Sequence, residues 1–194
     1  MNTSHNSDER YEPLWREPDP PHVDNHIITN SFATGTATRL DPLNPLDPQD
    51  LKPNLAYQSP GIEYFTDEHR LPARVRGRLQ LVAQEQRTRH PTAQRNTGKL
   101  GGHGYDGGHI IAVSLGGHPS GPNLSPQISN MNRSAYKRLE NGWRSALADG
   151  ITVEVDISLT FDPANPAVAP HIIAHWWENN EPWDLALLNE AHSQ

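Results

Sequence analysis

The feature that most restricts the fold of this chain is the distribution of proline in its first fifty residues. Proline lacks a backbone N–H and disfavours helix in the residue before it, so a proline every few residues excludes a regular helix or a central strand. The prolines in this span are Pro13, Pro18, Pro20, Pro21, Pro42, Pro45 and Pro48. We therefore interpret residues 1–52 as a Pro/Asp-rich, irregular linker or tail, and we place the folded domain at 53–194.

Composition excludes several classes of protein. The 194 residues contain no cysteine, which excludes disulfide frameworks, thiolate metal sites and cysteine nucleophiles. The first thirty residues are polar, acidic and interrupted by proline, so we expect no classical signal peptide and no membrane partner. The net charge is −7, but residues 61–100 carry eight basic and four acidic side chains. This local excess of +4 permits a positively charged groove on an acidic protein.

Hydrophobic periodicity predicts a mixed α+β fold. Residues 73–81 alternate between small or apolar side chains and arginine, and residues 151–161 alternate between apolar and polar side chains, as strands do. A turn at 162–166 and a partner strand at 167–177 follow. Residues 132–149 have apolar side chains at helical spacing and end at Gly150. Residues 86–108 are polar and rich in glycine, which predicts a long exposed loop.

The densest chemical signal begins within that loop. Asp-Gly-Gly-His at 106–109 precedes an apolar run, and paired glycines allow the backbone to approach a ligand closely. Asn-Leu-Ser-Pro-Gln follows at 123–127, and Asn-Met-Asn-Arg follows at 130–133, where the predicted helix begins. A histidine titrates near neutral pH and can act as a base. A histidine followed by an asparagine-rich loop and an asparagine at a helix start is more specific than a lone histidine.

These segments together resemble the DNA/RNA non-specific endonucleases, which are ββα-metal or His-Me finger nucleases. The branch that is most similar occurs as toxin domains of bacterial polymorphic toxins, and residues 64–70 resemble the strand that begins that branch. The resemblance covers about residues 53–178. It implies an α+β fold with a ββα-metal finger core, a central antiparallel sheet and one long metal-bearing helix.

The resemblance also implies roles for particular residues. His109 matches the general base, Asn132 matches the direct ligand of a single Mg²⁺ that Mn²⁺ can replace, and Asn123 matches an asparagine that orients the histidine or its loop. Glu140 matches a glutamate that contacts metal-bound water. On an ideal α-helix Asn132 and Glu140 lie about 12 Å apart along the axis, so both cannot bind one ion directly. The alternative for Glu140 is an ordinary surface acid beside basic residues.

One position departs from the family pattern. Many relatives carry an arginine where this chain has Gly107, and that arginine is expected to stabilise the phosphate. Another cation must replace it, and the candidates are Arg133 and Arg70. The other residues expected to bind the nucleic-acid backbone are Arg74, Arg76, Arg78 and Lys137. No residue set is suited to reading bases, so cleavage without sequence preference is expected.

The sequence therefore predicts a magnesium-dependent, non-specific endonuclease that acts on DNA, with RNA as a further candidate substrate. We expect a bacterial toxin effector that is secreted or delivered into the cytoplasm of a target cell and is inhibited by a cognate immunity protein. The alternative is a catalytically degenerate nuclease fold that binds nucleic acid or a protein. The missing arginine favours this alternative, whereas the combination of His109, Asn123 and Asn132 opposes it.

Overall fold

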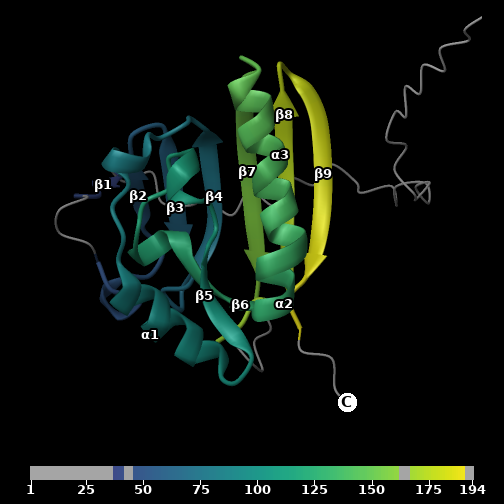
Figure 1. Ribbon diagram of the computed structural model, residues 1–194. Coiled ribbons are helices and arrows are strands. Elements are labelled where there is room, and N and C mark those ends of the chain that lie inside the picture. The colour runs from purple at the N-terminus through teal and green to yellow at the C-terminus, as the bar shows by residue number, and fades with distance from the viewer. Residues whose placement is uncertain (1–36, 42–45, 162–166, 191–194) are drawn as a thin grey trace, which may run out of the picture. The chain divides into compact units, whose positions relative to one another are not determined.

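The computed structural model describes residues 37–41, 46–161 and 167–190. In these residues the main element is a seven-stranded sheet in the order β1-β2-β3-β4-β7-β8-β9 (Figure 1). Its strands β1 and β2 are parallel, and each other neighbouring pair is antiparallel. The strands are β1 (Thr38–Arg39), β2 (Ala56–Ser59), β3 (Ile62–Thr66), β4 (Pro72–Arg78), β7 (Val153–Thr160), β8 (His171–Glu178) and β9 (Glu181–Leu188).

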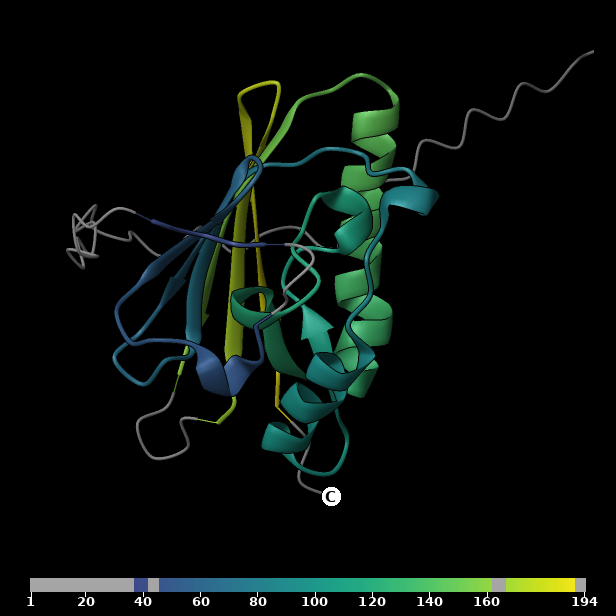
Figure 2. The same ribbon diagram turned by 90° about the vertical axis from the view of Figure 1, so that its left-hand side faces the viewer.

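A second layer covers one face of this sheet, as Figure 2 shows. It contains the helix α1 (Pro91–Gly101), the two-stranded antiparallel sheet of β5 (Tyr105–His109) and β6 (Leu124–Ile128), and a helical segment from 129 to 148. That segment consists of α2 (Ser129–Met131), the π-helical turn η5 (Asn132–Tyr136) and α3 (Lys137–Ala148). The 3₁₀ turns are η1 (Pro48–Asp50), η2 (Gln84–Gln86), η3 (Val113–Leu115) and η4 (Gly121–Asn123). No described helix is long and apolar enough to cross a bilayer.

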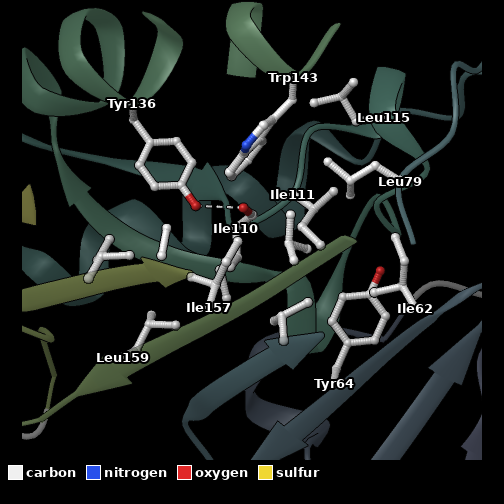
Figure 3. Close-up of a cluster of buried hydrophobic side chains, with 14 of the residues drawn as sticks. Ile62, Tyr64, Leu79, Ile110, Ile111, Leu115, Tyr136, Trp143, Ile157 and Leu159 are labelled. Atoms are coloured by element: carbon white, nitrogen blue, oxygen red, sulfur yellow. Dashed lines mark hydrogen bonds between the residues drawn. The ribbon is translucent and has the colours of Figure 1, made fainter. Parts of the chain in front are cut away.

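The hydrophobic core lies between the two layers (Figure 3). Ile157 of β7 and Tyr64 of β3 pack from the large sheet, and Trp143 of α3 packs from the helical layer. The apolar residues Ile110 and Ile111, which directly follow β5, are fully buried between them. Because burial of these side chains removes apolar surface from water, the segment after His109 is anchored firmly to the core.

The strands predicted from alternation are confirmed. The pattern at 73–81 corresponds to β4, the pattern at 151–161 to β7, and the partner strand to β8, which begins at His171. The strand β9 was not predicted from its sequence. The predicted helix at 132–149 is also confirmed, although it begins earlier, at Ser129, and contains the π-helical turn. The predicted turn at 162–166 lies outside the described residues.

The prediction of a long loop at 86–108 is wrong, because this segment contains α1 and β5. Pro91 occupies the first turn of α1, where its missing N–H costs nothing, and the His90 side chain accepts a hydrogen bond from the backbone N–H of Ala93. The buried face of α1 consists of Ala93, Thr97 and Gly98. These small residues produce little hydrophobic periodicity, so the sequence pattern did not reveal the helix.

The folded domain also begins before residue 53. The strand β1 pairs with β2, and the side chains of Leu40 and Leu51 are 4% and 2% exposed within the core. The described residues 37–41 and 46–52 therefore pack with the domain and are not a linker outside it. Residues 1–36 of the predicted linker lie outside the described residues.

Candidate active site

A groove of about 530 Å³ lies where α1, β5 and the start of the long helix meet. Among the residues expected to act on nucleic acid, Asn132 and Arg133 line it. The helix α1 contributes Gln94, Arg95 and Lys99 to the opposite wall. The remaining lining residues are Gly98, Gly102, Tyr105, Asp106 and Gly107.

His109 ends β5, and its ring is held in one orientation. Its Nε2 lies 3.2 Å from the carbonyl oxygen of Pro119. Because a carbonyl oxygen can only accept a hydrogen bond, Nε2 carries the proton of the neutral ring, and Nδ1 keeps its lone pair. His109 Nδ1 lies 3.4 Å from Nε2 of Gln94, a residue that lines the groove. His109 itself does not line the groove, and Gln94 connects its basic nitrogen to the groove wall.

The environment of His109 keeps the imidazole neutral. Burial lowers the pKa of His109 below its ordinary value of 6.5, the Pro119 carbonyl opposes this shift, and the neighbouring His118 lowers the pKa further. At neutral pH the ring is therefore uncharged and can accept a proton. This is the protonation state that a general base requires.

Asn123 does not contact the groove. Its side chain is fully buried; its Oδ1 accepts from the Ile111 N–H at 2.9 Å, and its Nδ2 donates to the carbonyls of Ile111 and His118 at 2.8 and 2.7 Å. These bonds join the two ends of the segment from 111 to 118. The residue that follows this segment, Pro119, provides the carbonyl that holds His109. Asn123 is thus placed to position His109 through the backbone.

Asn132 is the first residue of the π-helical turn, between α2 and α3. Such turns contain one residue more than an α-helical turn and often occur at functional sites. The side chain of Asn132 is half-buried and lines the groove. Because the turn departs from α-helical geometry, the spacing between Asn132 and Glu140 differs from that of the ideal helix assumed from sequence.

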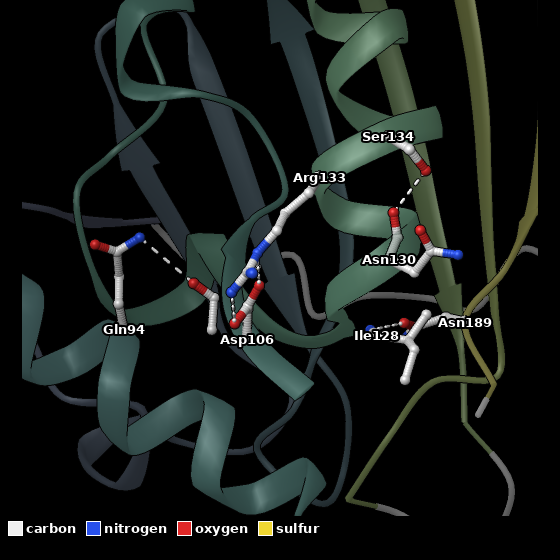
Figure 4. Close-up of polar contacts among 8 residues, drawn as sticks. Gln94, Asp106, Ile128, Asn130, Arg133, Ser134 and Asn189 are labelled. Carbon is white, nitrogen blue, oxygen red and sulfur yellow. Dashed lines mark hydrogen bonds and ion pairs between the residues drawn. The ribbon is translucent and has the colours of Figure 1, made fainter. Parts of the chain in front are cut away.

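Arg133 is held over β5 by a bidentate ion pair, drawn in Figure 4. Its Nε and one terminal nitrogen donate to the two carboxylate oxygens of Asp106, both at 2.9 Å. Paired bonds of this kind fix the plane of a guanidinium group. The role of Asp106 was missed from sequence, although it is the first residue of the Asp-Gly-Gly-His motif. Gln94 was missed because its segment was interpreted as a loop.

Glu140 lies outside the groove. Its side chain is buried, and Lys137 Nζ lies 3.6 Å from its carboxylate. Burial raises the pKa of Glu140, and Lys137 partly opposes this shift. The structure therefore pairs Glu140 with Lys137 on α3, and neither lines the groove with Asn132.

The other predicted arginines are also not brought to the groove. Arg74, Arg76 and Arg78 alternate along β4 with Val75, which points into the core, so they lie on the sheet face that points away from α1 and α3. Arg74 donates from Nε to Asp156 at 2.7 Å, and Arg76 donates to Glu63 at 2.8 Å. Arg70 is exposed in the turn between β3 and β4.

The absence of an arginine at Gly107 has a packing reason. A Cβ atom at this position would lie 1.8 Å from the backbone oxygen of Gln94, because α1 packs its backbone directly against β5. On the other side of the contact, a Cβ at Gly98 would lie 2.8 Å from the backbone nitrogen of Gly107. No side chain at position 107 is compatible with α1 in this place.

We expect Gly107→Ala to destabilise the domain by about 3 kcal/mol or more, since overpacking against a backbone that cannot yield is more costly than overpacking against side chains. Urea unfolding would measure this free energy. The matched control is Gly142→Ala on α3, where an added Cβ meets nothing within 4 Å. That change should stabilise the helix by about 0.5–1 kcal/mol. Equal stability of the two variants would contradict the close packing of α1 on β5.

The two-stranded sheet of β5 and β6 precedes the long helical segment, with His109 at the end of β5 and Asn132 at the start of the π-helical turn, which is the order that the resemblance implies. A sequence model of the DNA/RNA non-specific endonuclease family matches residues 53–173. The chain belongs to this family, and it is an endonuclease.

Solved structures share the fold. NucA from Streptococcus agalactiae with a magnesium ion bound is 17% identical, with a TM-score of 0.56 over 76% of this chain and 77% of that one. The same nuclease with no metal bound has a TM-score of 0.52 at 17% identity, over 76% of each chain.

Proposed function

We propose that this endonuclease hydrolyses phosphodiester bonds of DNA without sequence preference, that it also accepts RNA, and that it depends on magnesium. The observation that carries the proposal is the orientation of His109. Its basic Nδ1 contacts Gln94, which lines a groove whose walls also carry Asn132 and three cationic side chains, namely Arg95, Lys99 and Arg133. A neutral base beside cations is the combination needed to activate water next to a phosphodiester.

The residues of the groove fit a divalent metal ion of the magnesium type. Within the described residues no cluster of three or more histidine, aspartate or glutamate side chains could hold a metal by itself. The groove offers the amide group of Asn132, whose oxygen is a hard donor, whereas both carboxylate oxygens of Asp106 already accept from Arg133. Magnesium binds through one or two such ligands, keeps several waters and accepts phosphate oxygens. When bound, the ion would supply positive charge to the phosphate as negative charge develops on it.

The side chains of this chain then have distinct tasks. His109 Nδ1 accepts a proton from the attacking water, while Nε2 keeps its proton and donates it in a hydrogen bond to the Pro119 carbonyl oxygen, which stabilises the imidazolium that forms. Asn123 keeps that carbonyl in place through its bonds to Ile111 and His118. Arg133, oriented by Asp106, places a guanidinium group at the edge of the groove where a phosphate oxygen would bind.

The biological role that we propose is that of a toxin effector, secreted or delivered into a target cell and inhibited by a cognate immunity protein. The motif resemblance and the proline-rich segment before the domain support this role. Expression of the chain within a bacterial cytoplasm should degrade nucleic acid and stop growth, and His109→Ala should relieve the effect. Normal growth despite accumulation of active enzyme would contradict it.

Incubation with supercoiled plasmid tests the enzymatic proposal. We expect nicked, linear and then fragmented DNA in the presence of magnesium, partial activity with manganese, and intact plasmid with a chelator. A single-stranded RNA of mixed sequence should be cleaved under the same conditions. If the folded chain shifts plasmid mobility without cutting it, the alternative of a degenerate nucleic-acid-binding fold is correct.

A further inference from the structure

Because α1 packs its backbone directly against β5, no side chain fits at Gly107 to place a charge in the groove. We infer that Arg95 and Lys99 of α1 supply this positive charge, and that together they form the wall of the active-site groove that binds the nucleic-acid backbone. This inference rests on the proposed function, because it concerns the substrate of the same groove. It differs from the expectation from sequence, which assigned this task to Arg70, Arg133, Lys137 and the arginines of β4.

The placement of these two side chains follows from the way α1 docks. Gln94 and Gly98 face β5, with the backbone oxygen of Gln94 and the backbone nitrogen of Gly107 at the point of contact. Arg95 and Lys99 each follow one of these residues, so both point to one side of the contact. Four residues apart on a helix, they lie on the same face about one turn from each other. Both line the groove that contains Asn132 and Arg133.

Their charges are available to a ligand. Arg95 and Lys99 are exposed, and neither forms an ion pair with a carboxylate of the described residues. Arg133, in contrast, is already paired with Asp106, and Arg74 and Arg76 are paired on the outer face of the sheet. An unpaired cation gains more from a phosphate than one that must first leave a carboxylate, since no existing bond is lost.

The groove is open, and its cations lie at helical spacing on one wall. This arrangement suits a polyanion that runs along α1 past Asn132. Contacts of this kind hold phosphates and read no base, in agreement with cleavage that is independent of sequence. Each such contact releases counterions from DNA, so its contribution to affinity must decrease as salt increases.

The test is the double variant Arg95→Gln/Lys99→Gln, compared with the charge-matched control Arg39→Gln/Arg87→Gln. Arg39 and Arg87 are exposed and do not line the groove. Both pairs are placed in a His109→Ala background, and binding of a fluorescein-labelled DNA duplex is measured by anisotropy across a salt series. Both pairs are also placed in the active enzyme, for which kcat and KM are measured on plasmid.

We expect the α1 pair to reduce the slope of log affinity against log salt by about 1.8, since each phosphate contact contributes about 0.9. The same contribution corresponds to about eightfold weaker binding per cation at 0.1 M salt. In the active enzyme kcat/KM should fall, mainly through a higher KM. The control pair should change neither the slope nor KM appreciably. Melting temperatures should be similar, because all four side chains are exposed.

The two proposals fail in different ways. If the α1 pair changes the slope no more than the control pair, the side chains are merely a solvated surface and the inference is overturned, even if the enzyme cleaves DNA. If the His109→Ala protein binds DNA and the α1 pair reduces the salt slope as expected, but the protein with His109 intact cleaves no DNA, the inference stands and the proposed function fails. If the His109→Ala protein without further changes binds no DNA duplex, the inference is overturned.

Discussion

His109→Ala should lower kcat by about two to four orders of magnitude, the usual contribution of a positioned general base. The reason is geometric: the basic Nδ1 of His109 lies 3.4 Å from Gln94 Nε2 at the groove wall, and its Nε2 is held by Pro119. Substrate binding should persist, because Asn132 and the groove cations remain. Single-turnover cleavage of plasmid with saturating magnesium measures the loss. His103→Ala is the control, since His103 is exposed in the turn before β5, whereas the ring of His109 is held by Pro119 and Gln94.

The pH dependence provides a second measurement of the same role. Only neutral His109 can accept a proton, so the rate should rise with pH and then level off. Because burial lowers the pKa of His109 below 6.5, the midpoint of the rise should lie below pH 6.5. His109→Ala should abolish this dependence. If His103→Ala is the inactive variant, or if the rate falls as pH rises through this range, the assignment of His109 as the base is wrong.

Asn132→Ala should lower cleavage by about 10²–10³-fold, comparable with the loss of one preorganised group that stabilises the transition state. Asn132 provides the amide oxygen that faces the groove from the π-helical turn. The apparent magnesium requirement should also increase, whereas duplex binding without metal should change little. A magnesium titration of the cleavage rate separates these effects.

The matched control for Asn132 is Asn130→Ala, two residues earlier on the same helical segment. Asn130 is exposed and does not line the groove, so its replacement should leave the magnesium titration unchanged. Circular dichroism and thermal melting should show that both variants remain folded. Undiminished cleavage by folded Asn132→Ala would remove this residue from the metal site.

Sequence patterns were most informative where burial alternates strongly along one element. The strands β4 and β7 and the helix α3 were predicted because large apolar side chains such as Val75, Ile157 and Trp143 recur at a strand or helix period. The helix α1 was missed because Ala93, Thr97 and Gly98 form its buried face. Its stability comes from close backbone packing on β5, which no hydrophobic scale reports.

By itself the sequence determined the mixed α+β class, the principal strands, the long helix and the motif that contains His109, Asn123 and Asn132. It did so because local periodicity and motif order depend on residues that are neighbours in the chain. Only the tertiary structure decided which cations share the groove with Asn132. The arginines of β4 and the two cations of α1, Arg95 and Lys99, are equally basic in sequence, but β5 and α1 pack on one face of the sheet, and the β4 arginines lie on the other. Which face of a sheet carries a site is set by long-range packing, and alternation along one strand contains no information about it.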